Sequence, residues 1–357
     1  MKGVFRWLTL AAALTVGGVL LAGCQAPGGE ELSYLGASEI TNLRVRLPQS
    51  ERITPSGKVV SYELVARKAQ WEVTRGVVAD AVTYNGTVPG PVLRVTEGDT
   101  LKVVLKNELD QDTSIHWHGV HVPSAMDGVP GVTQQPVRPG ETFTYEFVAS
   151  HAGTFIYHPH TKSVAQIDNG LYGALIIDPR ESPDPRFDRE FIMVLGAWQI
   201  GRGADMQPQG GMAMAMDYNY FTINGRAYPA IEPWTVKKGD KVRVRIINIS
   251  NLAHPMHLHG HDFKVVAKDG ETIPSERQQV VNTVTVNAGE TYDIVFIANN
   301  LGNWVFHCHE LHHTENNGVE PGGLIQLIRY EGAPPLPTGQ APAAPTPMPQ
   351  RMPGMGH

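Results

Sequence analysis

The segment VTEGDTLKVVLKN, residues 95–107, returns in altered form as VKKGDKVRVRIIN, residues 236–248. In both copies a Gly-Asp pair precedes a run in which apolar and polar residues alternate, which is the pattern of a half-buried β-strand. An internal repeat of this length indicates two homologous domains built from the same elements.

Histidine pairs keep the spacing of the repeat. The two copies are 141 positions apart. At the same offset, His116 and His118 correspond to His257 and His259. An offset of 149 carries GETF at 140–143 onto GETY at 289–292, and with it His158 and His160 onto His307 and His309. Around these motifs, short runs of Val, Ile, Thr, Tyr and Phe are separated by Gly, Pro, Asn and Asp. The sequence therefore predicts an all-β protein of two tandem domains.

The domains are expected at residues 40–182 and 190–331, with a boundary near 179–189 where Pro183 and Pro185 interrupt the pattern. Before them, a basic start, an apolar run at 7–21 and the sequence Leu-Ala-Gly-Cys ending at Cys24 predict an export signal at 1–24. Its end resembles the lipobox of bacterial lipoproteins, whereas plain secretion or a retained anchor are the alternatives. We expect a polar tether at 25–39 and a Pro/Ala/Met-rich disordered tail at 332–357.

The net charge and the counts of histidine and cysteine restrict the function classes that the sequence allows. A formal charge of -6 over 357 residues gives no reason to expect a nucleic-acid partner, which would favour a basic surface. The chain has 15 histidines but only 2 cysteines, Cys24 and Cys308. Acylation of Cys24 would leave no partner for an intrachain disulfide, so Cys308 needs another explanation.

The spacing of the histidines points to metal. Residues i and i+2 of a strand face the same side, so each His-x-His pair offers two imidazoles to one site. Cys308 lies between His307 and His309 and therefore faces the opposite side, which implies a second, separate metal site. A thiolate with two imidazoles suits an electron-transfer copper, and His254 and His313 are the candidate imidazoles.

The motifs HWHG at 116–119, HPH at 158–160, HPMHLH at 254–259 and HCHELHH at 307–313 resemble the four copper-binding motifs of multicopper oxidases, in the usual order. The resemblance implies two tandem cupredoxin-like Greek-key β-sandwich domains and four coppers per chain. It implies a type 1 copper on His254, Cys308 and His313. The type 2 copper would be held by His116 and His257, and the type 3 pair by His118, His158, His160, His259, His307 and His309.

Two departures refine the resemblance. The first-domain positions that match the type 1 ligands are Thr113, Pro159 and Val164, so that domain has no type 1 site. This weighs against copper nitrite reductases, a related family that keeps the cysteine in its first domain. The family's axial position falls at Gly318 with Val319 next, so the axial residue is Val319 or there is none.

A carboxylate near the histidine cluster is expected, since oxygen reduction consumes protons. Asp127 resembles the family's acidic residue at that place, although a turn-forming Asp-Gly is an equal alternative. Glu310 and Glu315 are possible second acids, and the sequence does not choose between them.

The resemblance implies an exported, lipid-anchored enzyme of the periplasm or the outer cell surface. It would couple one-electron oxidation of phenolic, aromatic or metal-ion donors to the reduction of dioxygen to water. Methionine-rich stretches, at 206–216 and 348–355, leave a cuprous oxidase for copper detoxification open, because thioethers select cuprous ion. A copper-storage or electron-carrier protein is the alternative without turnover. Each domain supplies half of the histidine cluster, and the resemblance to two-domain laccases favours a homotrimer.

Overall fold

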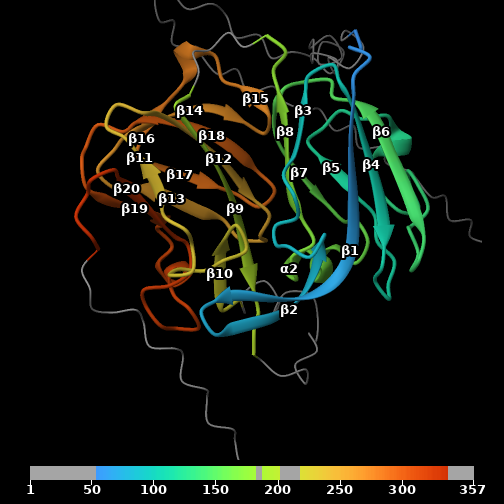
Figure 1. Cartoon of the computed structure of the whole chain (residues 1–357), viewed down its shortest axis with the longest axis horizontal. Coiled ribbons are helices and arrows are strands. Elements are labelled where there is room, and N and C mark those ends of the chain that lie inside the picture. Colours follow the sequence, from blue (N-terminus) through green and yellow to red (C-terminus); the bar gives the residue numbers. More distant parts are fainter. Residues whose placement is uncertain (1–53, 182–186, 202–217, 337–357) are drawn as a thin grey trace, which may run out of the picture. The chain divides into compact units, whose positions relative to one another are not determined.

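The computed structural model describes residues 54–181, 187–201 and 218–336 (Figure 1). The expected export signal with Cys24, the tether, both methionine-rich stretches and the tail from residue 337 lie outside the described residues, as do Pro183 and Pro185. In the described ranges, no helix has the length and apolar character needed to cross a membrane.

The first half forms two four-stranded sheets. One has the order β2 (Val77–Tyr84), β1 (Val59–Thr74), β4 (Thr100–Asn107), β6 (Thr142–Val148). The other has the order β3 (Leu93–Thr96), β8 (Gly173–Asp178), β7 (Gly153–His158), β5 (His116–His118). A 3-10 turn, η2 (Ser124–Met126), follows β5, and a short helix, α2 (Ser163–Asp168), follows β7.

The second half repeats this plan with longer sheets. Its larger sheet runs β10 (Tyr220–Ile223), β9 (Arg189–Trp198), β12 (Lys241–Asn248), β18 (Thr291–Ile297), β14 (Phe263–Lys268), β15 (Glu271–Thr272), and β16 (Val280–Val281) pairs with β14. Its smaller sheet runs β11 (Trp234–Val236), β20 (Ile325–Tyr330), β19 (Asn303–Cys308), β13 (His254–Leu258), β17 (Thr283–Val286). Two 3-10 turns, η4 (Ser275–Arg277) and η5 (Leu311–Thr314), follow β15 and β19.

The repeated segments become equivalent strands. Leu101, Val103 and Leu105 of β4 point into the first core, and Val242 and Val244 of β12 point into the second. Each half buries its own apolar cluster between its two sheets. The all-β prediction is confirmed, whereas the exact domain boundaries remain predictions.

The alternating pattern ends in the second part of β12, where the residues from Arg245 to Asn248 are all buried. Arg245 of β12 stands where a solvent-facing side chain is expected, yet it is 1% exposed. It is buried because this face of the second half packs against β7 of the first half. A buried guanidinium is tolerated only when its charge is paired and its hydrogen bonds are satisfied.

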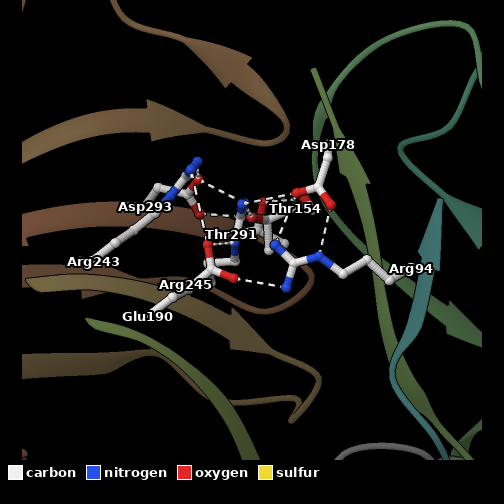
Figure 2. A network of polar contacts seen from close by, with 8 residues as sticks. All are labelled: Arg94, Thr154, Asp178, Glu190, Arg243, Arg245, Thr291 and Asp293. Carbon is white, nitrogen blue, oxygen red and sulfur yellow. Dashed lines mark hydrogen bonds and ion pairs between the residues drawn. The ribbon is translucent and has the colours of Figure 1, made fainter. Parts of the chain in front are cut away.

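A polar network satisfies that condition (Figure 2). Arg245 donates from Nη1 to Thr154 Oγ1 at 2.6 Å and to Asp293 Oδ2 at 3.1 Å, and from Nε to Glu190 Oε2 at 3.0 Å. Thr154 Oγ1 in turn donates to Asp293 Oδ1 at 2.7 Å. The network extends through Arg94, which pairs with both Glu190 and Asp178. Thr154 is therefore the first-half residue that the buried ion pair of the second half requires.

Replacing Thr154 by Val should lower the free energy of unfolding by about 1–3 kcal/mol, because it removes a partner from both buried charges without changing the shape of the side chain. Thr144→Val, at an exposed position of β6, is the matched control and should have little effect. Urea unfolding of the two variants measures the difference. Equal stability of both variants would contradict a role for Thr154 in joining the halves.

Candidate metal centres

A cysteine and two histidines meet at one end of the smaller sheet of the second half. His254 begins β13 and Cys308 ends the adjacent β19, while η5 supplies His313. Cys308 Sγ lies 3.4 Å from His313 Nδ1 and 3.8 Å from His254 Nδ1, and the two Nδ1 atoms are 3.1 Å apart. All three side chains are buried. Three donor atoms therefore converge on one point, as the sequence predicts for this set.

Burial determines the protonation of this triad. It lowers the pKa of His254 to about 4 and that of His313 to about 3, so both imidazoles are neutral at neutral pH. Burial also raises the pKa of the Cys308 thiol to about 12. A metal ion that binds the Cys308 thiolate must therefore displace the proton of the thiol.

The chemistry of the triad fits copper. Ser250 Oγ lies 2.7 Å from His254 Nε2, which fixes the ring with Nδ1 toward Cys308. One sulfur and two nitrogens in a trigonal arrangement are the donor set of an electron-transfer copper site. Sequence reasoning missed Ser250, because no local pattern marks the partner of a ligand.

Val319, the sequence's candidate for the axial position, lies on the surface of the protein. Val319 is 41% exposed and belongs to a turn closed by hydrogen bonds with Asn316. Leu324 instead is fully buried in the same core cluster as Cys308. Its carbonyl accepts from the Cys308 N–H, and its N–H donates to the His313 carbonyl. Counting on from His313 therefore reaches a residue on the surface.

Four first-half histidines gather around β5 and β7. His116 and His118 lie on β5, and His116 stands opposite His158 of β7. Ligand atoms of these three histidines all lie within 4.8 Å of one another. His160, just beyond β7, brings its ring centroid to 5.5 Å from that of His116.

Four second-half histidines form a matching group: His257 of β13 and His307 of β19, with His259 and His309 directly after these strands. His257 stands opposite His307 in the antiparallel pair, and His259 Nε2 lies 3.0 Å from His307 Nε2. The His309 ring centroid is 5.8 Å from that of His257. Strand alternation separates this group from the triad, because Cys308 turns inward and is fully buried, whereas His307 is partly exposed and His309 exposed.

Main-chain carbonyls orient several of these rings. The Nδ1 atoms of His116, His158, His257 and His307 lie 2.8–3.0 Å from carbonyl oxygens of Asp127, Pro159, Asn282 and Cys308. A carbonyl can only accept, so Nδ1 carries the proton and donates it. Nε2 then keeps its lone pair for a metal, which is the usual arrangement of ligand histidines.

The two groups do not meet in one chain. Within the described residues, no hydrogen bond or ring contact joins a first-half histidine to a second-half one. His118 approaches the second half at Gly289. A Cβ atom added to this glycine would lie 3.2 Å from the His118 ring. A cavity of about 430 Å³ lined by His116, His118, Asp269 and Gly289 opens there. Asp269 lies outside the four motifs, and no pattern predicts its place.

Asp127 lies in a turn and beside His116. Its carbonyl accepts from His116 Nδ1, and its carboxylate Oδ1 lies 3.3 Å from the same nitrogen. It also precedes Gly128, whose φ of +80° and close approach to the Ile115 carbonyl require glycine. The turn therefore places the carboxylate beside His116. Neither Glu310 nor Glu315 has a hydrogen bond to the eight clustered histidines in the described structure.

Fold and sites together define a class: a two-domain β-sandwich protein with one Cys-His₂ centre and two groups of four histidines. Family models described as multicopper oxidase match residues 65–182 and 204–319. The chain belongs to the multicopper oxidase family, whose members bind copper, and it is of the laccase-like, two-domain type.

Named relatives support this membership. The chain is 32% identical to copper resistance protein A of Escherichia coli, covering 73% of this chain and 50% of the relative. It is 31% identical to multicopper oxidase MmcO of Mycobacterium tuberculosis, covering 73% and 56%. The chain thus spans about half the length of the curated relatives it matches. Among solved structures, the blue copper oxidase of Nitrosomonas europaea is 32% identical with a TM-score of 0.71, covering 77% of this chain and 87% of that one. The cupredoxin-like fold expected from the motifs is confirmed.

Cys308→Ser should abolish the intense blue colour of the copper-loaded protein and its oxidase activity, because serine cannot supply the thiolate. Copper bound by the clustered histidines should remain. Visible absorption and copper content per chain measure both effects. Cys24→Ser makes the same chemical change at the other cysteine and should keep the blue colour; turnover near the wild-type rate in Cys308→Ser would refute the assignment.

Asp127→Asn should leave the blue colour intact and slow oxygen reduction on the order of 10- to 100-fold, because the amide keeps the turn but loses the carboxylate next to His116. Stopped-flow reoxidation of the reduced protein across a pH series measures this rate. Asp110→Asn, on the exposed rim of the first half, is the control. An unchanged rate at every pH would leave Asp127 with the turn alone.

Proposed function

We propose that the protein is a laccase-like oxidase that couples one-electron oxidation of small phenolic, aromatic or metal-ion donors to the four-electron reduction of dioxygen to water. The observation that carries this is the convergence of His254, Cys308 and His313 next to a separate set of clustered histidines. An electron carrier needs only the triad, so the clustered histidines favour turnover.

Different residues of the chain would bind copper, conduct electrons and deliver protons. Bound copper, four ions per chain in this proposal, would supply one-electron redox chemistry and a site for dioxygen. Cys308 is joined through two peptide bonds to His307 and His309, which gives electrons a short covalent route from the triad to the histidine cluster. Asp127 holds the ring of His116 and provides a carboxylate for proton delivery.

A cuprous oxidase for copper detoxification is the second candidate. The E. coli relative is named a copper resistance protein, and this chain carries methionine-rich stretches outside the described residues. A copper nitrite reductase is disfavoured because Pro159 stands where the first-domain cysteine would be. Export and a lipid anchor on Cys24, at the periplasmic or outer face of the envelope, are proposed from the sequence motif alone.

Oxygen uptake tests the proposed activity. Copper-loaded full-length protein is supplied with a phenol, with ferrous ion or with cuprous ion, and oxygen consumption is followed with an electrode. Uptake of one O₂ per four electrons donated is the expected stoichiometry. A protein that binds copper but consumes no oxygen with any donor would be a storage or carrier protein.

The cluster is proposed to assemble between subunits. The two groups of four histidines have no contact within one chain, and both groups retain solvent exposure. Pairing the first half of one subunit with the second half of the next is a head-to-tail contact that closes into a ring. The proposed oligomer is a homotrimer with three complete clusters.

Co-expression should reveal such shared sites. A chain with His116 and His118 replaced by Ala and a chain with His257 and His259 replaced by Ala are each expected to be inactive alone. Mixed oligomers should recover part of the activity, because some interfaces pair two intact halves. The size of the oligomers is measured by light scattering. Mixed oligomers that form and stay inactive would place the whole cluster in a single chain.

A further inference from the structure

An exposed histidine lies directly above the buried Cys-His₂ triad. His312, in η5, is adjacent in sequence to the triad residue His313, and their ring centroids are 4.1 Å apart. The His312 side chain is 58% exposed, whereas His313 is 3% exposed. The His313 ring also contacts Phe221, whose centroid is 4.1 Å away. His312 thus connects the covered triad to the solvent.

The triad offers no donor a direct contact of its own. His313 Nε2 is buried and has no hydrogen-bond partner among the described residues, and Nδ1 faces Cys308. A ligand histidine with an exposed edge would let a donor touch that edge. Because His313 is covered, an electron donor in solution reaches its ring through a neighbour.

Glu310 prepares His312 to bind a cation. His312 Nδ1 lies 3.1 Å from Glu310 Oε1, and the Glu310 side chain is 53% exposed. A carboxylate accepts only, so the Nδ1–H donates and Nε2 keeps a lone pair with no partner among the described residues. This carboxylate–imidazole arrangement is the one that metal-binding histidines use, since it fixes the ring and raises its basicity.

The surrounding charge favours a cation over an anion. Glu310, Glu315 and Glu320 lie within eleven consecutive residues, and the sequence has no Lys or Arg between Arg277 and Arg329. Negative charge on a surface loop raises the local concentration of cations and their rate of encounter. Exposed Leu311 and Val319 flank the same loop and would favour an apolar donor instead.

We propose that His312, oriented by Glu310, is the docking point for a redox-active transition-metal cation that donates electrons to the triad. This proposal rests on the proposed oxidase function and names its donor class. Each docked ferrous or cuprous ion loses one electron through the His312 and His313 rings, which contact edge-to-face, and leaves with one more positive charge. Four such losses and four protons balance the conversion of one O₂ to two waters. A single protein ligand holds the ion weakly enough for the oxidised product to depart.

Steady-state kinetics of three variants test the docking point. His312→Ala and Glu310→Gln in the copper-loaded, full-length protein should raise KM for ferrous ion on the order of tenfold or more, with the blue absorption retained and KM for 2,6-dimethoxyphenol within about twofold. Glu320→Gln removes the same charge from the same loop and is the matched control, with KM for ferrous ion within about twofold. Zn²⁺ serves as a redox-inert probe, whose binding by calorimetry should weaken in His312→Ala.

The outcomes are separable. If KM for the phenol rises and KM for ferrous ion does not, the site takes organic donors and the proposal is wrong. If neither KM changes while the wild type consumes oxygen, His312 is no docking point although the oxidase function stands. If the wild type consumes no oxygen, the proposed function fails, and Zn²⁺ binding that is identical in wild type and His312→Ala overturns the docking point independently.

Discussion

The alternation of side chains along β19 is the constraint on which both metal centres depend. A strand turns successive residues to opposite faces, so Cys308 enters the core while His307 and His309 stay at the surface. The pairing with β13 then brings His254 to the buried centre and His257 to the outer group. Two sites of different chemistry are thus fixed back to back by one pair of strands.

Burial separates the chemistry of the two centres. The triad lies in an apolar core, where desolvation holds both imidazoles neutral and the free thiol protonated. Most of the clustered histidines retain solvent exposure, and carbonyl acceptors fix the proton of four of them on Nδ1. A buried site suits electron transfer with little reorganisation, whereas a surface site needs a second surface to close it. The proposed ring of subunits would supply that surface.

The junction between the halves combines an apolar cluster, which includes Ile156 of the first half and Ile247 of the second, with a buried polar network. Arg245 and Asp293 are both about 2% exposed, and their charges are satisfied across the junction by Thr154 (Figure 2). Such a network is directional, because its hydrogen bonds are met in one relative placement of the halves. It therefore fixes the direction in which each half presents its group of four histidines. The apolar clusters, which are not directional, could not do this alone.

The sequence by itself determined the all-β fold, the internal repeat and the histidine and cysteine sets that gather in the structure, because strand periodicity and the spacing of motifs are local properties. It could not choose between the two interpretations of Asp127, since only the path of the turn brings the carboxylate to His116. It left the axial position open between Val319 and no residue, and only the fold shows that Val319 lies on the surface. The burial of Arg245, the cover that His312 provides over His313 and the separation of the two histidine groups were decided by tertiary structure. Each depends on packing between segments whose distance in space no local pattern encodes.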